Sequence, residues 1–110
     1  MREAHHCVYV VQLDEAVMQE RKFVEANPHF SPSKNHKTPL YVGMTGVPVE
    51  QRFQNHMSGY KSSRYVQKYG VRLLPDLYEH LNPMMFEEAV EMEKECAERL
   101  RKVGHPVWQR

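Results

Sequence analysis

The sequence has few cysteines and no long hydrophobic segment, and these absences exclude several classes of protein. Only two cysteines, Cys7 and Cys96, occur among 110 residues, and their spacing fits no CxxC or other zinc-binding motif. The seven histidines form no HxxxH or HExxH pair. Neither a signal peptide nor a long apolar run is visible. We therefore expect a reduced, cytoplasmic protein that does not interact with membranes and has no structural zinc.

The chain also lacks a strong net charge, although its basic residues are unevenly distributed. The formal net charge is +1, which argues against strong non-specific binding to nucleic acid. Residues 51–75 nevertheless contain no acidic residue and five basic ones, interleaved with three tyrosines. Because cations neutralise phosphates and aromatic rings stack on bases, this segment is either a nucleic-acid surface or a solvated basic loop with core tyrosines. The candidate nucleic-acid contacts in it are Lys61, Arg64 and Lys68.

Length and composition indicate an ordinary globular protein. A chain of 110 residues is expected to form a single domain over residues 1–110. Apolar residues make up 41% and charged residues 26% of the chain, so there is no bias of the kind found in disordered proteins. No internal repeat and no low-complexity segment interrupts it.

Three short apolar segments predict strands. Residues 7–13 (CVYVVQL) are β-branched, aromatic and almost continuously apolar, as in a central strand that is covered on both faces. Residues 39–42 and 71–74 are the other two expected strands. Between the first two, residues 14–38 predict a helix ending before Asn27 and then a loop. This segment is either an arm that contacts a substrate or padding at the edge of the sheet.

A helix is expected directly after the second strand. Gly43 and Gly46 bracket a strand-to-helix turn, and Pro48 suits the first turn of the following helix because it needs no intrahelical donor there. One face of this helix carries Val49, Arg52, Phe53, His56 and Tyr60. An arginine and a histidine among apolar residues either lie at the edge of that face, with the head group in water, or belong to a functional site.

The longest helix is expected over residues 83–103, with Asn82 as its N-cap and Gly104 as its stop. Glu93 lies near the middle of its apolar face, where an ionised carboxylate without a partner would cost several kcal/mol. Three arrangements would satisfy this side chain: a salt bridge to Arg52, a neutral hydrogen-bonded form, or a metal ion.

These residues, taken in order, resemble the signature of the GIY-YIG endonuclease family. A triplet YxG alone is a weak signal, but the ordered set of tyrosine, YxG, arginine and helical glutamate is fairly specific, and the resemblance spans nearly the whole chain. The matching positions are Cys7-Val8-Tyr9, Tyr41-Val42-Gly43, Thr45, Arg52, His56 and the segment 89–93 that ends in Glu93.

The resemblance implies a fold and an activity. The fold is α+β, with a small, mainly antiparallel three-stranded sheet flanked by helices. The activity is metal-dependent hydrolysis of phosphodiester bonds in nucleic acid, with DNA expected before RNA. Family members often depend on a second domain for specificity, so in this chain specificity would come from the 14–38 arm, from a homo-oligomer or from a separate specificity subunit.

The family's residue roles transfer to five catalytic candidates. Glu93 would hold Mg²⁺ or Mn²⁺, because hard cations of this kind bind few carboxylates and keep several waters. Arg52 would stabilise negative charge on the phosphate, and Tyr9 and Tyr41 would position or deprotonate the attacking water. His56 would assist proton transfer or contact a phosphate.

Two further positions and two departures complete the comparison with the family. Gly43 would let the backbone approach the nucleic acid, and Thr45 would hydrogen-bond the adjoining turn. Cys7 replaces the first glycine of the signature, and Met44 replaces a lysine found in several members. Losing that cation favours an alternative function, a catalytically weak or inactive module that binds structured DNA or RNA. A third alternative is a protein-interaction domain in which Arg52 and Glu93 form a buried ion pair.

Overall fold

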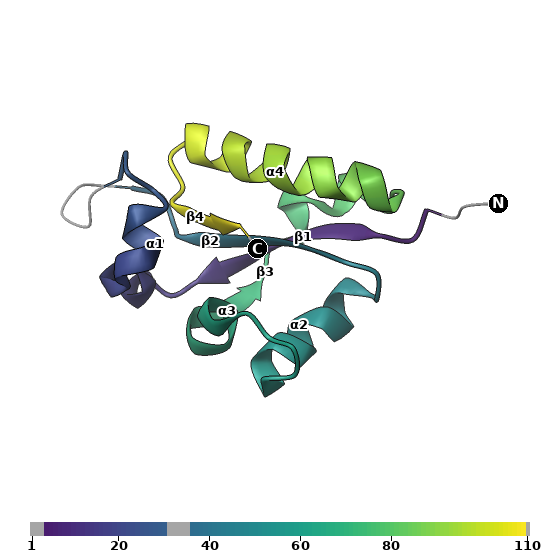
Figure 1. The fold of residues 1–110 in the computed structure, drawn as a ribbon, viewed down its shortest axis with the longest axis horizontal. Helices are drawn as coiled ribbons and strands as arrows, with labels where there is room; N and C mark the ends of the chain where they lie inside the picture. Colours follow the sequence, from purple (N-terminus) through teal and green to yellow (C-terminus); the bar gives the residue numbers. More distant parts are fainter. Residues whose placement is uncertain (1–3, 31–35, 110) are drawn as a thin grey trace.

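The structure is a computed structural model that describes residues 4–30 and 36–109. It has an α+β fold (Figure 1). The strands within these ranges are β1 (Cys7–Leu13), β2 (Leu40–Thr45), β3 (Gly70–Leu73) and β4 (Val107–Gln109). They form a single sheet in the order β3-β1-β2-β4. β1 is antiparallel to both of its neighbours and β4 is parallel to β2, so the sheet is mixed.

The fourth strand makes the prediction of a mainly antiparallel three-stranded sheet wrong, because the described sheet has four strands and includes a parallel pair. β4 has only three residues, too few to show the alternation by which a strand is recognised in a sequence. It follows the turn that ends the last helix and pairs with Leu40–Val42. Just before it, the Leu40 N–H donates to the carbonyl oxygen of Pro106 at 2.9 Å. Its formation therefore depends on where the C-terminal helix delivers the chain.

The helices in the described ranges cover both faces of the sheet (Figure 1). One α-helix, α4 (Phe86–Lys102), crosses one face, and α2 (Val49–Ser58) and α3 (Arg64–Tyr69) lie on the other. The remaining helical segments are η1 (Glu15–Gln19), α1 (Arg21–Glu25), η2 (Pro75–Leu77) and η3 (Glu79–Leu81). No helix in residues 4–30 or 36–109 is long and apolar enough to cross a membrane.

The central strand β1 occupies the predicted residues, and burial on both faces explains its apolar sequence. Since side chains alternate along a strand, Tyr9 and its cross-strand partner Gly43 belong to the α2 and α3 face. Their neighbours Val8 and Met44 belong to the α4 face, where both are buried. A lysine in place of Met44 would therefore lie in the core beneath α4.

The long helix starts three residues later than predicted. α4 begins at Phe86, and the Met85 N–H donates to Oε1 of Glu88 at 3.0 Å. Asn82 is not the N-cap, because its side chain is bound to β1. Its Oδ1 accepts from the Val8 N–H at 2.9 Å, and its Nδ2 donates to the Val8 carbonyl oxygen at 2.7 Å. β3 pairs only with Val11–Leu13, so the Asn82 amide provides the hydrogen bonds that a longer β3 would give to Val8. The helix ends as predicted, before Gly104, which has φ of 111°.

The segment 14–38 forms η1 and α1 instead of one continuous helix, and residues 31–35 lie outside the described ranges. Its Asn27 is buried and joins three parts of the chain. Oδ1 accepts from the Val107 N–H at 2.8 Å and from Nε of Arg101 at 3.1 Å, while Nδ2 donates to the Phe23 carbonyl oxygen at 2.9 Å. The described part of the segment therefore fixes the edge strand β4.

Replacing Asn27 with alanine should destabilise the fold. The buried N–H of Val107 would lose its acceptor, at a cost of about 1–3 kcal/mol of unfolding free energy. Urea denaturation should show this loss for Asn27→Ala and a change within about 0.5 kcal/mol for Gln54→Ala, an exposed control on α2. Equal stability of the two variants would contradict the role assigned to Asn27.

Candidate functional site

The close approach of Tyr9 to Gly43 forms the floor of the site. The β2 strand continues through Gly43 to Thr45 and does not end at residue 42 as predicted. A Cβ atom on Gly43 would lie 2.7 Å from the hydroxyl oxygen of Tyr9 and 2.9 Å from Cε1 of Tyr41. Only glycine leaves room for both rings on this face of the strand. Gly43 therefore accommodates the two tyrosines, whereas the sequence reading assigned it to backbone contact with nucleic acid.

Helix α2 brings His56 onto the same face. The helix begins after Pro48 and ends at Gly59, whose φ of 90° suits a glycine. His56 is fully buried, and its Nε2 lies 2.6 Å from the hydroxyl oxygen of Tyr9. The ring centroids of Tyr9, Tyr41 and His56 lie 5.6–6.1 Å apart. Three of the five catalytic candidates thus form one cluster.

The tautomer of His56 follows from its second hydrogen bond. Ser63 donates its backbone N–H to Nδ1 of His56 at 2.9 Å, so Nδ1 carries no proton. A neutral imidazole must then carry its proton on Nε2, which donates to the hydroxyl oxygen of Tyr9. In this arrangement His56 does not accept the phenol proton. It holds the ring of Tyr9 and leaves the phenol proton available to another acceptor.

Burial sets the protonation of both groups. It lowers the pKa of His56 to about 4, helped by the positive charge of Arg52, so His56 is neutral at pH 7. Burial also raises the pKa of Tyr9, and interaction with Tyr41 adds to this, while Arg52 opposes it. Tyr9 is therefore a protonated phenol at neutral pH. This favours positioning of water by Tyr9 over deprotonation of it.

Arg52 and Lys61 border a cavity beside the cluster. Nη2 of Arg52 donates to the carbonyl oxygen of Lys61 at 2.8 Å. Lys61 has φ of 45°, a left-handed conformation that costs a non-glycine residue roughly 1–2 kcal/mol. The cavity has a volume of about 290 Å³ and is lined by Tyr41, Arg52, Lys61, Ser62, Ser63 and Trp108. Two cationic residues therefore line a cavity that also reaches the tyrosine cluster.

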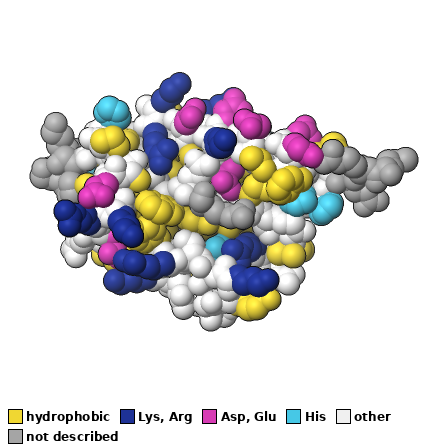
Figure 2. Space-filling model, in the orientation of Figure 1, with side chains coloured by type: hydrophobic (Ala, Val, Ile, Leu, Met, Phe, Trp, Pro, Cys, Tyr) yellow, Lys and Arg dark blue, Asp and Glu magenta, His cyan; other side chains and the backbone are white. Residues whose placement is uncertain are grey.

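The other candidate nucleic-acid contacts lie elsewhere. Lys and Arg side chains gather on the side of α2 and α3, whereas α4 carries both acidic and basic side chains (Figure 2). Within the basic group, Arg64 and Lys68 form ion pairs with Glu20 at 3.5 and 3.6 Å. The hydroxyl of Tyr69 also donates to Glu20, at 3.0 Å, and this bond lowers the pKa of the Glu20 carboxyl. Neither cation lines the 290 Å³ cavity.

Thr45 is buried and holds the turn before α2. Its Oγ1 accepts from the Val47 N–H at 3.1 Å and donates to the Val47 carbonyl oxygen at 3.2 Å. The expected turn bond is therefore present. Because the hydroxyl is engaged in both bonds, Thr45 acts on the shape of the turn in this conformation.

Glu93 approaches from the opposite face of the sheet. It belongs to α4, and its side chain is buried between that helix and the sheet, as its place on the apolar face predicted. Only 7% of its surface is exposed. Its Oε1 accepts from Nε2 of Gln109 at 3.3 Å. Gln109 pairs with Val42, the residue before Gly43. The carboxylate of Glu93 is therefore close to the part of β2 whose opposite face is covered by the ring of Tyr9. The described part of β4 ends at Gln109.

The donor set limits which metal sites this chain can form. The described residues contain no group of three or more His, Cys, Asp and Glu side chains able to hold an ion. A cation that loses most of its water does not fit here. The Mg²⁺ or Mn²⁺ expected from the sequence would rely on the single carboxylate of Glu93, because such ions bind few protein ligands. The 3.3 Å bond from Gln109 is long, so a cation can compete for that oxygen.

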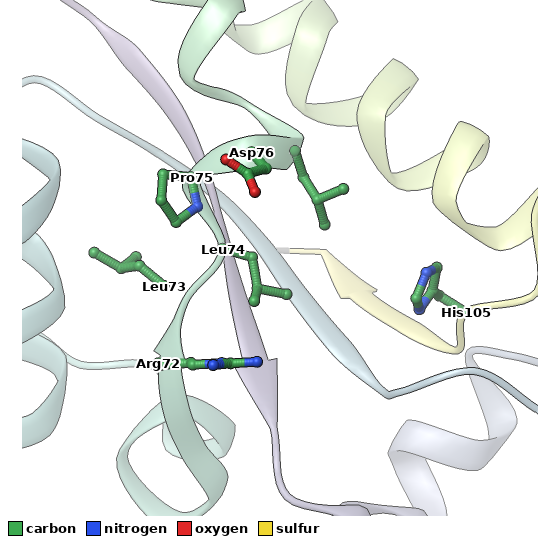
Figure 3. Close-up of a pocket in the computed structure, with 7 residues that line it drawn as sticks. Arg72, Leu73, Leu74, Pro75, Asp76 and His105 are labelled. Carbon is green, nitrogen blue, oxygen red and sulfur yellow. The ribbon is translucent and has the colours of Figure 1, made fainter.

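A larger cavity lies between residues 72–77, which follow the sheet from β3, and His105, which precedes β4, and it contains none of the predicted site residues. Its volume is about 430 Å³, and its polar groups come from Arg72, Asp76 and His105 around an apolar wall of leucines (Figure 3). It is lined by Arg72, Leu73, Leu74, Pro75, Asp76, Leu77 and His105. The candidate site is therefore chosen by the cluster of Tyr9, Tyr41 and His56 beside the smaller cavity, and not by cavity volume.

Sequence reasoning missed two residues of the site, Ser63 and Trp108. Ser63 acts through its backbone N–H, which every residue except proline has, so no sequence signal marks it. Trp108 is the single tryptophan of the chain and lies on the strand that was not predicted. No family model, curated protein or solved structure matches this chain.

Gly43→Ala should displace Tyr9 and break its bond to His56. The added methyl group would overlap the hydroxyl oxygen of Tyr9, and overpacking of a buried site costs about 1–3 kcal/mol. Thermal unfolding should show this loss, and Gly46→Ala should cost less because its nearest contact is the end of the His6 side chain at 3.1 Å. If both variants melt at the same temperature, the contact between Tyr9 and Gly43 is not close.

His56 should make stability depend on pH. Its folded pKa of about 4 lies below the ordinary value of 6.5, so the unfolded chain binds more protons between these values. The stabilisation is complete above about pH 6.5 and is lost as the pH falls to 4, by about 3 kcal/mol in total. Urea denaturation from pH 7 to pH 4 should therefore show a shallower decline in His56→Gln than in the wild type. The exposed His80→Gln should keep the wild-type slope.

Proposed function

We propose that this chain is a metal-dependent endonuclease of the GIY-YIG type that hydrolyses phosphodiester bonds, in DNA before RNA. The observation that carries the proposal is the convergence of Tyr9, Tyr41 and His56 beside a cavity lined by Arg52. Their order in the sequence matches the family signature, and they come from two strands and a helix. Their meeting on one face is not required by the fold alone.

Arg52 would bind the scissile phosphate. Its guanidinium is permanently charged and one of its nitrogens already donates to the Lys61 carbonyl oxygen, which fixes its orientation. Donors that are held in place before reaction stabilise the charge that develops on the phosphate oxygens without reorganising. Lys61 would add a second positive charge at the same cavity.

The tyrosines and His56 would orient the attacking water. Tyr9 accepts a hydrogen bond from His56, which leaves its own O–H to donate to another acceptor. Because Tyr9 is fully buried and does not line the cavity, it would act on the water through Tyr41, with which it interacts. Tyr41 contributes the second phenol and also lines the cavity. His56 would act as a positioning residue, because both of its ring nitrogens are already hydrogen-bonded.

Glu93 would hold the hydrated Mg²⁺ or Mn²⁺ at the edge of the sheet. A bound cation of this type supplies positive charge to the phosphate oxygens and a low-pKa water. Glu93 lies on the α4 side of the sheet, where it is bonded to Gln109 of the edge strand β4, and Arg52 lies at the cavity on the α2 side, which Trp108 of β4 also lines. Substrate would therefore bind along the edge of β2 beyond Val42.

A catalytically weak or inactive module that binds structured nucleic acid is the second candidate. The observation that favours it is the raised pKa of Tyr9, together with its complete burial, since a protonated and shielded phenol is a poor base. Met44 does not add to this, because its side chain lies on the α4 face of the sheet and not beside the cluster.

The protein-interaction alternative required a buried ion pair between Arg52 and Glu93. The structure gives these side chains different partners: Arg52 donates to the Lys61 carbonyl oxygen, and Glu93 accepts from Gln109. They also approach from opposite faces of the sheet. This arrangement favours the two nucleic-acid proposals over the third.

Arg52→Gln and Glu93→Gln should remove cleavage without unfolding the protein. Loss of one group that stabilises the transition state typically lowers kcat by at least about 100-fold. The substrates would be supercoiled plasmid, branched and flapped DNA, and structured RNA, each with Mg²⁺ or Mn²⁺. Cleavage by the wild type should disappear on addition of EDTA.

Two exposed residues provide matched controls. Glu91→Gln removes a carboxylate from the same helix as Glu93, and Arg72→Gln removes an arginine outside the 290 Å³ cavity. Both should cut at the wild-type rate. A folded wild type that binds these nucleic acids in EDTA and never cuts them would replace the nuclease with the binding module.

A further inference from the structure

Trp108 places an aromatic ring at the proposed nuclease site. It lies on β4 directly opposite Tyr41 in the parallel register, and both side chains line the cavity that Arg52 and Lys61 border. Trp108 is half-buried, so part of its indole faces the cavity and part contacts the protein. No catalytic role assigned above uses this ring.

The indole is held rigidly in place. It packs against Tyr65 in an edge-to-face arrangement, with ring centroids 4.8 Å apart and an interplanar angle of 81°. The preceding residue, Val107, is tied to Asn27 through its N–H and to Arg101 through its carbonyl oxygen, at 2.8 Å each. An aromatic side chain fixed in this way loses little conformational entropy when a ligand stacks on it.

The cavity combines the two chemistries of a nucleotide. Arg52 and Lys61 supply positive charge for a phosphate, and Trp108 and Tyr41 supply aromatic surface for a base. A base in an intact duplex is stacked on its neighbours and cannot reach such a ring, whereas an unpaired base can. A volume of about 290 Å³ is small compared with a duplex and suits a single inserted nucleotide.

We propose that Trp108 stacks on an unpaired base, and that this chain therefore acts on single-stranded or frayed nucleic acid. The inference rests on the proposed function, in which Arg52 binds the adjoining phosphate. It adds the substrate class: a strand with at least one unpaired nucleotide next to the bound phosphate. Fully paired DNA would reach the phosphate site without the stacking contact and would bind more weakly.

The fluorescence of Trp108 tests this directly, because it is the only tryptophan in the chain. The full chain would be titrated in EDTA with a single-stranded thymidine 12-mer, with the corresponding duplex, with a 12-mer of abasic nucleotides and with thymidine monophosphate. We expect saturable quenching by the single strand and about tenfold weaker binding of the duplex. The abasic strand should not quench, and the mononucleotide should bind far more weakly than the 12-mer.

Variants read by anisotropy of a labelled strand complete the test. Trp108→Leu should weaken single-strand binding about tenfold and leave duplex binding unchanged, and Trp108→Phe should keep the preference. Phe86→Leu, a change to an exposed aromatic outside the cavity, should have no effect. Rescue by phenylalanine separates stacking from a folding defect.

The outcomes distinguish this inference from the proposed function. Equal quenching by single strand and duplex, or unchanged affinity in Trp108→Leu, overturns the stacking inference even if metal-dependent cleavage is observed. Failure of every nucleic acid to bind or to be cut overturns both. Quenching by the monophosphate as strong as that by the 12-mer would indicate a mononucleotide pocket and would also overturn the single-strand inference.

Discussion

The buried hydrogen bond between Tyr9 and His56 is the interaction on which the rest of the site depends. Both side chains are completely shielded from water, so each polar group needs a partner inside the protein. Tyr9 supplies one for Nε2 of His56, and the Ser63 N–H supplies the other for Nδ1. The bond joins the central strand to α2. It therefore fixes the rotation of that helix, and with it the direction of Arg52 one turn earlier.

The edge strand β4 is a second constraint, and it is built from distant parts of the chain. Asn27 from the 14–38 segment accepts from the Val107 N–H, and Gln109 donates to Glu93 on α4. Trp108, between these two residues, lines the cavity. β4 thus presents Val107 and Gln109 to one face of the sheet and Trp108 to the other. Adjacent residues of this strand contact the two candidate groups on opposite faces of the sheet: Trp108 is paired with Tyr41, and Gln109 is bonded to Glu93.

The parts of the structure that were predictable from the sequence are those set by local patterns. The continuous apolar run of β1, the stop of α4 before Gly104 and the burial of Glu93 all follow from side-chain periodicity and from residues with special backbone preferences. Two of the parts that were not predictable depend on contacts between residues 74 or more positions apart. Asn82 has the composition of an N-cap but binds Val8, and Asn27 reads as a loop residue but binds β4.

In the proposed nuclease, the distribution of charge favours recognition through contacts in the cavity over attraction by the overall electrostatic field. Arg64 and Lys68 belong to the basic segment 51–75, yet both pair with Glu20, which cancels part of their attraction for phosphate at a distance. Arg52 and Lys61 remain at the cavity, and a chain with a net charge of +1 gains little from long-range attraction. In the proposed nuclease, affinity must then come from short-range contacts, which depend on the shape of the substrate. The strained backbone of Lys61 is consistent with this, because its left-handed conformation presents the carbonyl oxygen that orients Arg52.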